Sequence, residues 1–490
     1  MDLVAPHDRQ AVTLACARDA LPSAAARAHD ALTRAHALFL QRRDAPALPL
    51  AQAAIALAPE RADSWTLLGI LHQRLGRAEA AERAYREALR LDAGYADAWT
   101  NLGNLLRDRD DRHGALLAFQ QAMRHAPGTP APVYNLGVAL EHFGDHAGAL
   151  AAFEAAVECD PAHVDARWNG ALALLRAGRF DEGFRDYEVR FQRGEPGPRA
   201  CTQPVWQGDS LAGRTILAWA EQGFGDMLQF LRFVPELARR GARVVLEVPA
   251  ALAGLASRVD GVAAIAVRGA EPPAFDTHIA LMSLPFALRL APDAPALRAP
   301  YLRPCEALRA TWRERLAAHA RPGARELAVG LVWAGNPAPR NAGERSPGLA
   351  TVRPLLHAPG LRWFSLQVGP GRAELERVDV GDTLVDLAPA IAHFDDTAAA
   401  IANLDVVVTC DTAVAHLAAA LGKPTFVMLP FARDWRHGLA ARTTTWYPSM
   451  RLFHQARRGD WTNVLRDLSD ALAEAVASQP SRALGAAHAK

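Results

Sequence analysis

A glycine-containing turn holds the first carboxylate of this chain that could do chemistry. Residues 215–234 predict a short apolar strand, a turn with Gly223 and Gly225, and then a helix whose apolar side chains share one face. Glycines at such a turn let a ligand approach the backbone closely, and the start of the following helix favours negative charge. Asp226 lies at that helix start. We therefore expect its carboxylate either to cap the helix or to accept a proton from a substrate.

A second candidate site follows the buried strand predicted at 406–410. Asp411, Thr412 and Ala413 come directly after it, and a helix of small residues carries His416 four positions after Thr412. A hydroxyl and backbone N–H groups at a helix start can hold a pyrophosphate, and alanines let the ligand come close. The alternatives are that Asp411 or Thr412 simply caps the helix and that His416 is a core histidine. Because positions i and i+4 share a helix face, we expect His416 near the ligand.

Polar residues also follow two other predicted strands of the second half. Asn336, Arg345 and Ser346 lie in the loop after one strand, and Gln367 ends the next. A guanidinium in such a loop can bind phosphate bidentately, although a solvated loop arginine is the alternative. Ligands of open parallel sheets bind at the carboxyl ends of the strands. The positions of these residues at strand ends therefore predict one shared binding site.

Strands that alternate with helices must position these residues, and that alternation predicts parallel sheets. The strand-like runs form two series, which separate near Arg298–Glu326, so we expect two Rossmann-like lobes with a cleft between them. The segment 434–455 is dense in Trp, Arg and His. We expect it to pack as an element that crosses the lobes, and the alternative is contact with donor and acceptor. The expected boundaries are an N-terminal helical segment 1–27, a repeat superhelix 28–197, a linker 198–204, a first lobe 205–305, a second lobe 306–477 and a disordered tail 478–490.

The N-terminal half repeats with a period of about 34 residues. Trp65 and Trp99 are one period apart, as are Gly69, Gly103 and Gly137, and alanine, aromatic and proline positions follow the same register. The pattern resembles the tetratricopeptide repeat, in which each unit is a pair of antiparallel helices with small residues where they cross. The predicted fold class is therefore an α-helical superhelix followed by an α/β region.

Asparagines recur in the same register two positions before the glycines, at Asn101, Asn135 and Asn169. They could line the inner groove of the superhelix, because amides both donate to and accept from an extended peptide backbone. The alternative is that they recur only because repeats duplicate. We expect a protein or peptide partner in this groove.

Composition narrows the class of protein. The net charge of +1 argues against a nucleic-acid binder. The five cysteines are scattered singly, which favours a reducing compartment over a disulfide framework. No uncharged run is long enough to span a bilayer, and the first twenty residues lack a signal-peptide core. The sequence predicts a cytoplasmic protein without a transmembrane segment.

The residues above carry a resemblance to a family of enzymes. The turn QGFGDMLQFLRFVPEL resembles the first loop of the ADP-heptose lipopolysaccharide heptosyltransferases, and DTAVAHLAAALGKP is similar to their donor loop. The resemblance implies the two-lobed GT-B fold, with the donor bound mainly by the second lobe. It implies Asp226 as general base, Arg345 facing the donor phosphates, Thr412 and Ala413 at the pyrophosphate, and Gln367 near the nucleoside. The joining of such a region to tetratricopeptide repeats also resembles the O-linked N-acetylglucosamine transferase.

We therefore expect transfer of a sugar from a nucleotide sugar, as co-substrate and without a further cofactor, to a hydroxyl of a protein or glycan. No pair of aspartates stands at a predicted strand end, so we expect no metal to be required. One alternative is an interaction scaffold with an inactive transferase-like region. Another is a nucleotide-sugar epimerase, which has no evident need of a peptide-binding superhelix.

Overall fold

The structure is a computed structural model that describes residues 23–194, 197, 199–319, 321, 326–337, 342–439 and 442–478. Residues 1–22 of the expected N-terminal segment and 479–490 of the expected tail lie outside these residues. The chain divides into two compact units, Met1–Phe143 and Gly144–Lys490. Within the described residues, no helix has both the length and the apolar character needed to cross a bilayer.

The first unit is built of helices that pack in pairs, α1 with α2, α3 with α4 and α5 with α6. Its helices are α1 (Ala24–Leu40), α2 (Asp44–Leu57), α3 (Ala62–Arg74), α4 (Ala78–Leu91), α5 (Ala96–Asp108), α6 (Arg112–His125) and α7 (Pro130–His142). The predicted helical repeats are confirmed.

Close packing explains the glycines of the repeat. A Cβ on Gly69 would lie 2.4 Å from Cε1 of Tyr85, and one on Gly103 would lie 2.8 Å from Cε1 of Phe119. Both distances are well below van der Waals contact, so only glycine lets the two helices of a pair approach this closely. The register of glycine and aromatic residue is therefore a packing requirement of the α3–α4 and α5–α6 pairs.

The second unit begins with helices and continues as two α/β lobes. Its helical part comprises α8 (His146–Cys159), α9 (Val164–Arg176), α10 (Phe180–Tyr187) and the 3-10 helix η1 (Glu188–Arg193). The first lobe is a parallel sheet of order β3-β2-β1-β4. Its elements are β1 (Thr215–Trp219), α11 (Phe224–Phe230), α12 (Val234–Arg239), β2 (Arg243–Val248), α13 (Ala250–Ala256), β3 (Val262–Val267), β4 (Thr277–Ala280) and α14 (Leu284–Leu288).

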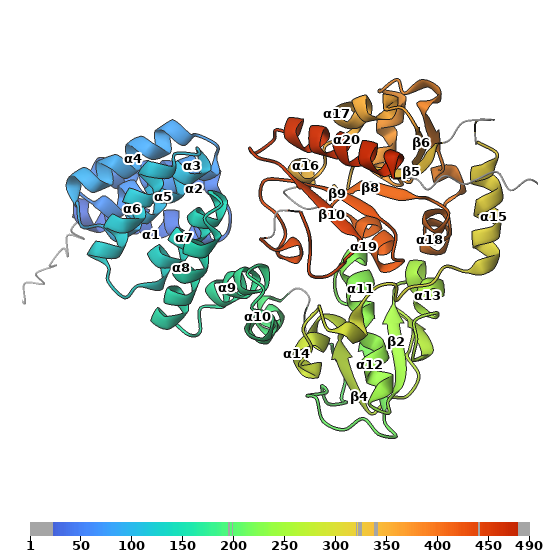
Figure 1. Ribbon diagram of the computed structural model, residues 1–490. Helices are drawn as coiled ribbons and strands as arrows, with labels where there is room; N and C mark the ends of the chain where they lie inside the picture. Colours follow the sequence, from blue (N-terminus) through green and yellow to red (C-terminus); the bar gives the residue numbers. More distant parts are fainter. Residues whose placement is uncertain are drawn as a thin grey trace, which may run out of the picture. The chain divides into compact units, whose positions relative to one another are not determined.

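The second lobe is a larger parallel sheet of order β10-β9-β8-β5-β6-β7. Figure 1 shows the two sheets, the first in green and the second in orange and red. The elements of the second lobe are α15 (Glu306–Ala317), β5 (Leu327–Val332), α16 (Ala342–Arg345), α17 (Leu349–Val352), β6 (Leu361–Ser365), β7 (Leu384–Asp386), α18 (Phe394–Ala402), β8 (Val406–Cys410), α19 (Ala413–Ala420), β9 (Thr425–Leu429), η9 (Trp435–His437), β10 (Met450–His454) and α20 (Thr462–Ala477). The predicted fold class, helical repeats followed by an α/β region with parallel sheets, is confirmed.

Two local predictions were wrong in detail. The single helix expected after the glycine turn is interrupted, because a 3-10 turn at Leu231–Phe233 separates α11 from α12, whose first turn contains Pro235. Strand β10 was not expected within 434–455, since the aromatic and charged residues before it hide its short apolar pattern. It pairs with β9 and forms one edge of the second sheet.

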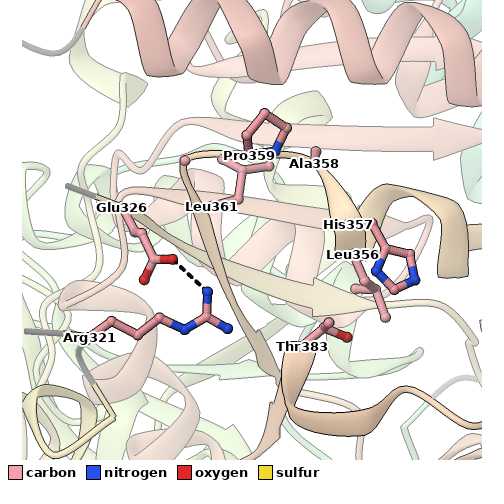
Figure 2. A pocket seen from close by; sticks show the side chains of 9 residues that line it. Arg321, Glu326, Leu356, His357, Ala358, Pro359, Leu361 and Thr383 are labelled. Atoms are coloured by element: carbon pink, nitrogen blue, oxygen red, sulfur yellow. Dashed lines mark hydrogen bonds and ion pairs between the residues drawn. The ribbon is translucent and has the colours of Figure 1, made fainter. Parts of the chain in front are cut away.

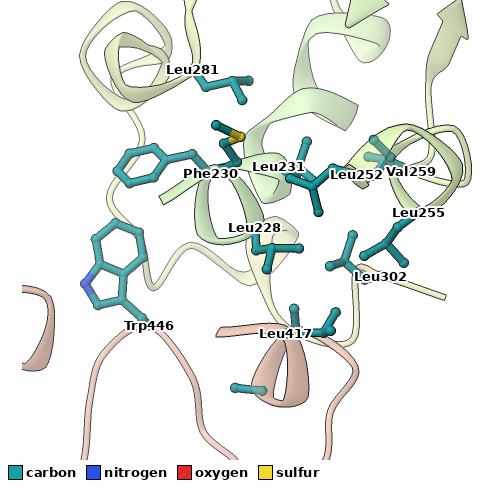
Figure 3. Close-up of a cluster of buried hydrophobic side chains, with 14 of the residues drawn as sticks. Leu228, Phe230, Leu231, Leu252, Leu255, Val259, Leu281, Leu302, Leu417 and Trp446 are labelled. Carbon is teal, nitrogen blue, oxygen red and sulfur yellow. The ribbon is translucent and has the colours of Figure 1, made fainter. Parts of the chain in front are cut away.

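One hydrophobic core joins the last helix pair to both lobes. Phe184 of α10 packs edge-to-face against Phe230 of the first lobe and Trp446 of the second, with ring centroids 6.1 and 6.3 Å apart. Figure 3 shows Trp446 beside Phe230 and Leu417 beside Leu228, at the boundary between the lobes. Such aromatic pairs add about 0.5–1.5 kcal/mol each beyond the burial of their surface. The last helix pair is therefore part of the core of the α/β region.

Candidate active site at the strand ends

Each sheet has a point where the chain reverses the direction in which it adds strands, and ligands of open α/β sheets bind at such points. In the first sheet this point lies between β1 and β4, and in the second between β5 and β8. The residues after these strands decide which of the two points is open to a ligand.

Arg190 of η1 fills the switch point of the first sheet. Its guanidinium lies 3.0 Å from both carboxylate oxygens of Glu221, which follows β1, and Nη2 donates to Oγ of Ser283, which follows β4, at 2.7 Å. Nη1 also lies 2.6 Å from Glu188. Arg190 is 1% exposed. The carboxyl ends of β1 and β4 are thus taken by a side chain of the last helix pair.

The second switch point carries Thr412 and the start of α19. Thr412 occupies the N-cap position in extended conformation, yet no side-chain capping bond forms. Its hydroxyl instead lies 3.1 Å from Oγ1 of Thr409, a buried residue of β8. The expected alternative, a residue that only caps the helix, is therefore not what Thr412 does here.

Asp411 and Arg345 form an ion pair at the same edge. Nη2 of Arg345 lies 2.7 Å from Oδ2 of Asp411 and 3.3 Å from its carbonyl oxygen. Nε2 of His437 lies 3.1 Å from Oδ1 of the same carboxylate. Burial opposes ionisation, but the charges of His437 and Arg345 outweigh it and lower the pKa of Asp411 below 3.8. Asp411 stays ionised and holds Arg345 beside the start of α19.

Asp226 reaches this place from the first lobe. Its Oδ2 accepts a hydrogen bond from the N–H of Gly223 at 3.0 Å, which caps α11. Its Oδ1 pairs with Nη2 of Arg436, whose Nη1 lies 2.7 Å from Asp434. Burial raises the pKa of Asp226 above 3.8, and the charge of Arg436 opposes part of that rise. Arg436 thus links the carboxylate of the first lobe to the second lobe.

The two lobes touch at Gly225. A Cβ on Gly225 would lie 3.0 Å from Cδ2 of His416 and 3.6 Å from Cα of Ala413. This places the starts of α11 and α19 side by side, as Figure 1 also shows. In the sequence, Asp226 directly follows Gly225 and Thr412 directly precedes Ala413. The structure therefore brings Asp226, Thr412, Ala413 and His416 together.

His416 and Gln367 have internal partners. Nδ1 of His416 lies 3.2 Å from the hydroxyl of Tyr447, and burial lowers the pKa of His416 to about 3, so the ring is neutral at neutral pH. Oε1 of Gln367 accepts from the N–H groups of Trp333 and Ala334, and its Nε2 donates to the carbonyls of Ala334 and Val368. Gln367 thus shapes the loop after β5, and its amide hydrogen bonds go to the backbone.

The loop after β5 is fixed by Ser346 and leaves Asn336 at the surface. Oγ of Ser346 accepts a hydrogen bond from the N–H of Gly335 at 3.1 Å. Asn336 is exposed in the same loop. Both residues lie at the carboxyl end of β5, beside the start of α19, since a Cβ on Gly335 would lie 3.5 Å from Cγ2 of Thr412.

The asparagines of the repeat lie in different units. Asn101 of α5 and Asn135 of α7 belong to the first unit, and each Nδ2 donates to the backbone carbonyl four residues earlier at 2.8 Å. Asn169 of α9 belongs to the second unit. The two amides of the first unit are partly exposed and are held along their own helices.

The cavities formed by described residues of the second unit include two of similar volume. One of about 230 Å³ is lined by Glu326, Gly360 and Thr383, which directly precede β5, β6 and β7, by Leu361 at the start of β6, and by Arg321, which pairs with Glu326. Figure 2 shows this cavity with its Arg321–Glu326 ion pair. It lies at the amino ends of the strands, the edge opposite to the one where ligands of such sheets bind. The other, of about 220 Å³, lies between the α9–α10 turn and residues 435–446.

Sequence reasoning missed the charged partners at this site. Asp434 and His437 were not singled out, Arg436 was expected to be structural, and Arg190 and Glu221 were not considered. Glu221 gives a weak signal, since it lies two residues before Gly223 at the end of a predicted strand. The partners of Asp226 and Glu221 lie 210 and 31 residues away in sequence, so no local pattern could identify them.

Models of known families match segments in both the helical part and the α/β part of the chain. Residues 62–95, 100–164 and 149–192 match models of the tetratricopeptide repeat. Residues 367–428 match the model of glycosyltransferase family 9 (heptosyltransferase). The chain carries tetratricopeptide repeats and a glycosyltransferase family 9 domain. The matched segment includes Asp411, Thr412 and His416, whereas Asp226 lies outside it. The resemblance to heptosyltransferases is confirmed, and that to the architecture of the O-linked N-acetylglucosamine transferase stays a prediction.

One curated relative and two solved structures are similar to parts of the chain. Protein FlbA of Caulobacter vibrioides is 30% identical over 335 residues, which cover 63% of this chain and 55% of FlbA. The chain therefore spans little more than half the length of that relative. A structure of Pseudomonas aeruginosa pilF is 19% identical and covers 36% of this chain and 78% of its own, with a TM-score of 0.33. A thermophilic TPR protein of Thermus thermophilus is also 19% identical, covering 34% and 90%, with a TM-score of 0.31.

Proposed function

We propose that this protein is a glycosyltransferase that moves a sugar from a nucleotide-sugar donor to a hydroxyl of a protein or glycan. The match of residues 367–428 to glycosyltransferase family 9 supports glycosyltransferase activity. The roles proposed below for single residues are argued from the geometry at the strand ends. The observation that carries the proposal is the contact of Gly225 with Ala413 and His416, which joins a carboxylate of one lobe to a helix start of the other. A transferase needs a base on the acceptor side and positive charge on the leaving-group side, and these two come from opposite lobes.

The donor diphosphate binds at the start of α19. The N–H groups of Thr412 and Ala413 favour an anion there, and Arg345 lies beside them through its pair with Asp411. A guanidinium has five N–H donors, and both bonds from Arg345 to Asp411 use Nη2. These groups stabilise the charge that grows on the departing diphosphate. We propose that this arrangement acts without a metal ion, so that transfer persists in excess EDTA.

Asp226 accepts the proton of the acceptor hydroxyl. Its raised pKa makes it a stronger base than an ordinary aspartate, and the charge of Arg436 favours its ionised form. The side chain of Asp226 is 20% exposed, so an oxygen of the substrate can reach its carboxylate. We place the nucleotide part of the donor near Gly223 and Gly225 of the first lobe and near Asn336, Ser346 and Gln367, which follow β5 and β6 of the second lobe.

The repeats present the acceptor. Tetratricopeptide repeats support a protein or peptide partner, and the partly exposed amides of Asn101 and Asn135 offer hydrogen bonds to an extended backbone. We assign Asn169 the same role in the second unit. Free cysteines, Cys159 and Cys410 among them, fit a reducing compartment, so we propose that the protein acts in the cytoplasm.

The substitution Asp226→Asn tests the proposal. A general base contributes about 10²–10⁴-fold to turnover, so kcat falls by that factor. The Kd for the nucleotide sugar changes less than about threefold, because Asn keeps the shape of the side chain and its acceptor oxygen for the N–H of Gly223. The matched control is Asp434→Asn, which removes the other carboxylate on Arg436 and leaves the base in place. Unchanged turnover in Asp226→Asn would remove this residue from the mechanism. Failure of every nucleotide sugar to bind would favour the scaffold alternative.

A further inference from the structure

The turn that carries Asp226 is held by the helical part of the second unit at two consecutive residues. Glu221 pairs through both carboxylate oxygens with Arg190 of η1, each at 3.0 Å. Nε2 of Gln222, the next residue, donates to the hydroxyl of Tyr187 at 3.0 Å. Tyr187 ends α10 and lies, like Arg190, in the segment that matches the tetratricopeptide repeat. The last repeat therefore contacts the turn at the two residues before its first glycine.

Gln222 bears directly on the geometry of the base. The peptide bond between Gln222 and Gly223 carries the N–H that donates to Oδ2 of Asp226 at 3.0 Å. Because a peptide unit is planar, the backbone of Gln222 sets the direction in which this N–H points. A hydrogen bond that fixes the side chain of Gln222 thus restrains the cap of α11 and, with it, the carboxylate.

Tyr187 also contacts the segment of the second lobe that holds the same carboxylate. The centroid of its ring lies 6.1 Å from that of Trp435, and the two rings are tilted by 54°. Arg436 follows Trp435, and its guanidinium carbon lies 4.4 Å from the centre of the Trp435 ring. The same guanidinium pairs with Asp226 through Nη2. One side chain of the last repeat thus contacts both segments that fix Asp226.

The surroundings of Tyr187 keep its hydroxyl neutral and in one place. Tyr187 is 1% exposed, and its ring packs against that of Trp168 of α9 with centroids 5.0 Å apart. Burial raises the pKa of Tyr187, and the nearby charges of Arg436 and Arg190 only partly oppose this rise, so the hydroxyl stays protonated at neutral pH. A side chain whose rotamer is locked by packing can hold a catalytic turn to the precision that chemistry needs.

We propose that Tyr187 is a positioning residue that fixes the turn of Asp226 through Gln222, so that the last repeat takes part in catalysis. The hold on the turn stands on the contacts above, and only its value for sugar transfer rests on the proposed function. A general base must lie within hydrogen-bond reach of the proton that it accepts. Displacement of such a group by about 1 Å can cost about 10²-fold in rate. Loss of the hydroxyl is therefore expected to slow turnover without changing how the donor binds.

Tyr187→Phe tests the proposal in the full chain, because it removes the hydroxyl and keeps the ring. Turnover is followed as nucleoside diphosphate released from ADP-, UDP-, GDP- or dTDP-sugars, with water as the acceptor. We expect kcat to fall about tenfold or more, while the Kd for the nucleotide sugar stays within about threefold. The matched control is Tyr85→Phe, since Tyr85 is also buried and its hydroxyl donates to Oε1 of Gln73 at 2.9 Å in the first unit. This control should leave kcat unchanged.

Two further measurements separate positioning from a general loss of stability. Gln222→Leu should lower kcat as Tyr187→Phe does, and the double variant should lose no more than Gln222→Leu alone, because the two residues act as one unit. Hydrogen exchange of the backbone amides of residues 221–226 should become faster in Tyr187→Phe and stay unchanged in Tyr85→Phe.

A kcat in Tyr187→Phe equal to that of the native chain, a loss equal to that in Tyr85→Phe, or losses that add in the double variant would overturn the proposal. In the first of these cases the native chain turns over nucleotide sugars, so the proposed function stands while the positioning role fails. If the native chain releases no nucleoside diphosphate from any of the sugars, hydrogen exchange decides. Faster exchange of residues 221–226 in Tyr187→Phe then keeps the hold of Tyr187 on the turn while the proposed function fails, and unchanged exchange overturns both.

Discussion

Substitution of Arg190 by Met is expected to destabilise the second unit strongly. Arg190 is 1% exposed and its main partner, the side chain of Glu221, is 0% exposed. Burial already raises the pKa of Glu221, and Arg190 is the charge that opposes this rise. Removal of one partner of a buried pair leaves an uncompensated charge and costs about 3–5 kcal/mol. Ser283 also loses the donor that reaches it at 2.7 Å.

Thermal unfolding of the full chain, followed by tryptophan fluorescence, measures this effect. A unit of this size (Gly144–Lys490) loses about 1.4 °C of Tm per kcal/mol, so Arg190→Met lowers the Tm of the second unit by about 4–7 °C. The control Arg185→Met removes an exposed arginine whose ion pair is worth about 0–1 kcal/mol. Addition of Glu221→Gln to Arg190→Met should recover part of the loss, because it removes the unpaired charge. A Tm drop no larger than that of the control would refute a stabilising role for Arg190.

Three further predictions concern the contact between the lobes. Arg436→Gln removes the charge that opposes the raised pKa of Asp226, so the acidic limb of kcat/KM against pH moves to higher pH, whereas Arg436→Lys leaves it near the native position. His416 has a pKa of about 3 in the folded chain and about 6.5 when unfolded, so the unfolded state takes up the proton first as pH falls between these values. The free energy of unfolding of the native chain therefore falls as the pH is lowered from 7 to 5. His416→Gln lacks this titrating group, so urea unfolding at the two pH values should show a smaller fall for the variant than for the native chain. Gly225→Ala places a Cβ 3.0 Å from His416 and should cost about 1–3 kcal/mol of stability and weaken donor binding. In the control Gly223→Ala the Cβ makes an ordinary 3.4 Å contact, so the cost should be smaller. Thermal unfolding measures the stability of both variants, and calorimetry measures their donor binding.

The sequence predicted those features that repeat or alternate locally. The glycine and aromatic register of the repeats follows from one kind of helix-pair contact, seen in Gly69 against Tyr85 and again in Gly103 against Phe119. The strands from β1 to β9 are short apolar runs, and their order along the chain predicts parallel sheets. Strand β10 was missed because Trp446 and its neighbours mask a five-residue pattern.

Long-range charge pairs were beyond sequence reasoning. Asp226 could be proposed as a base from the turn that holds it, but its partner Arg436 is 210 residues away. Likewise, the buried pair of Arg190 and Glu221 joins a helical repeat to a sheet, and no period or motif relates the two. The bonds of Gln367 were equally beyond prediction, since its place at a strand end does not reveal that its amide holds the backbone of the loop after β5.

Calorimetric titration of ADP-, UDP-, GDP- and dTDP-sugars tests the central claim most directly, namely that the carboxyl ends of β5 and β8 bind a donor diphosphate. We predict that at least one of these nucleotide sugars binds the native chain saturably and that Arg345→Gln weakens it tenfold or more, about 1.4 kcal/mol. Arg372→Gln, which removes an exposed arginine paired with Asp386, should leave the affinity unchanged. Absence of binding by all four, or equal affinity in Arg345→Gln and the native chain, would contradict this account.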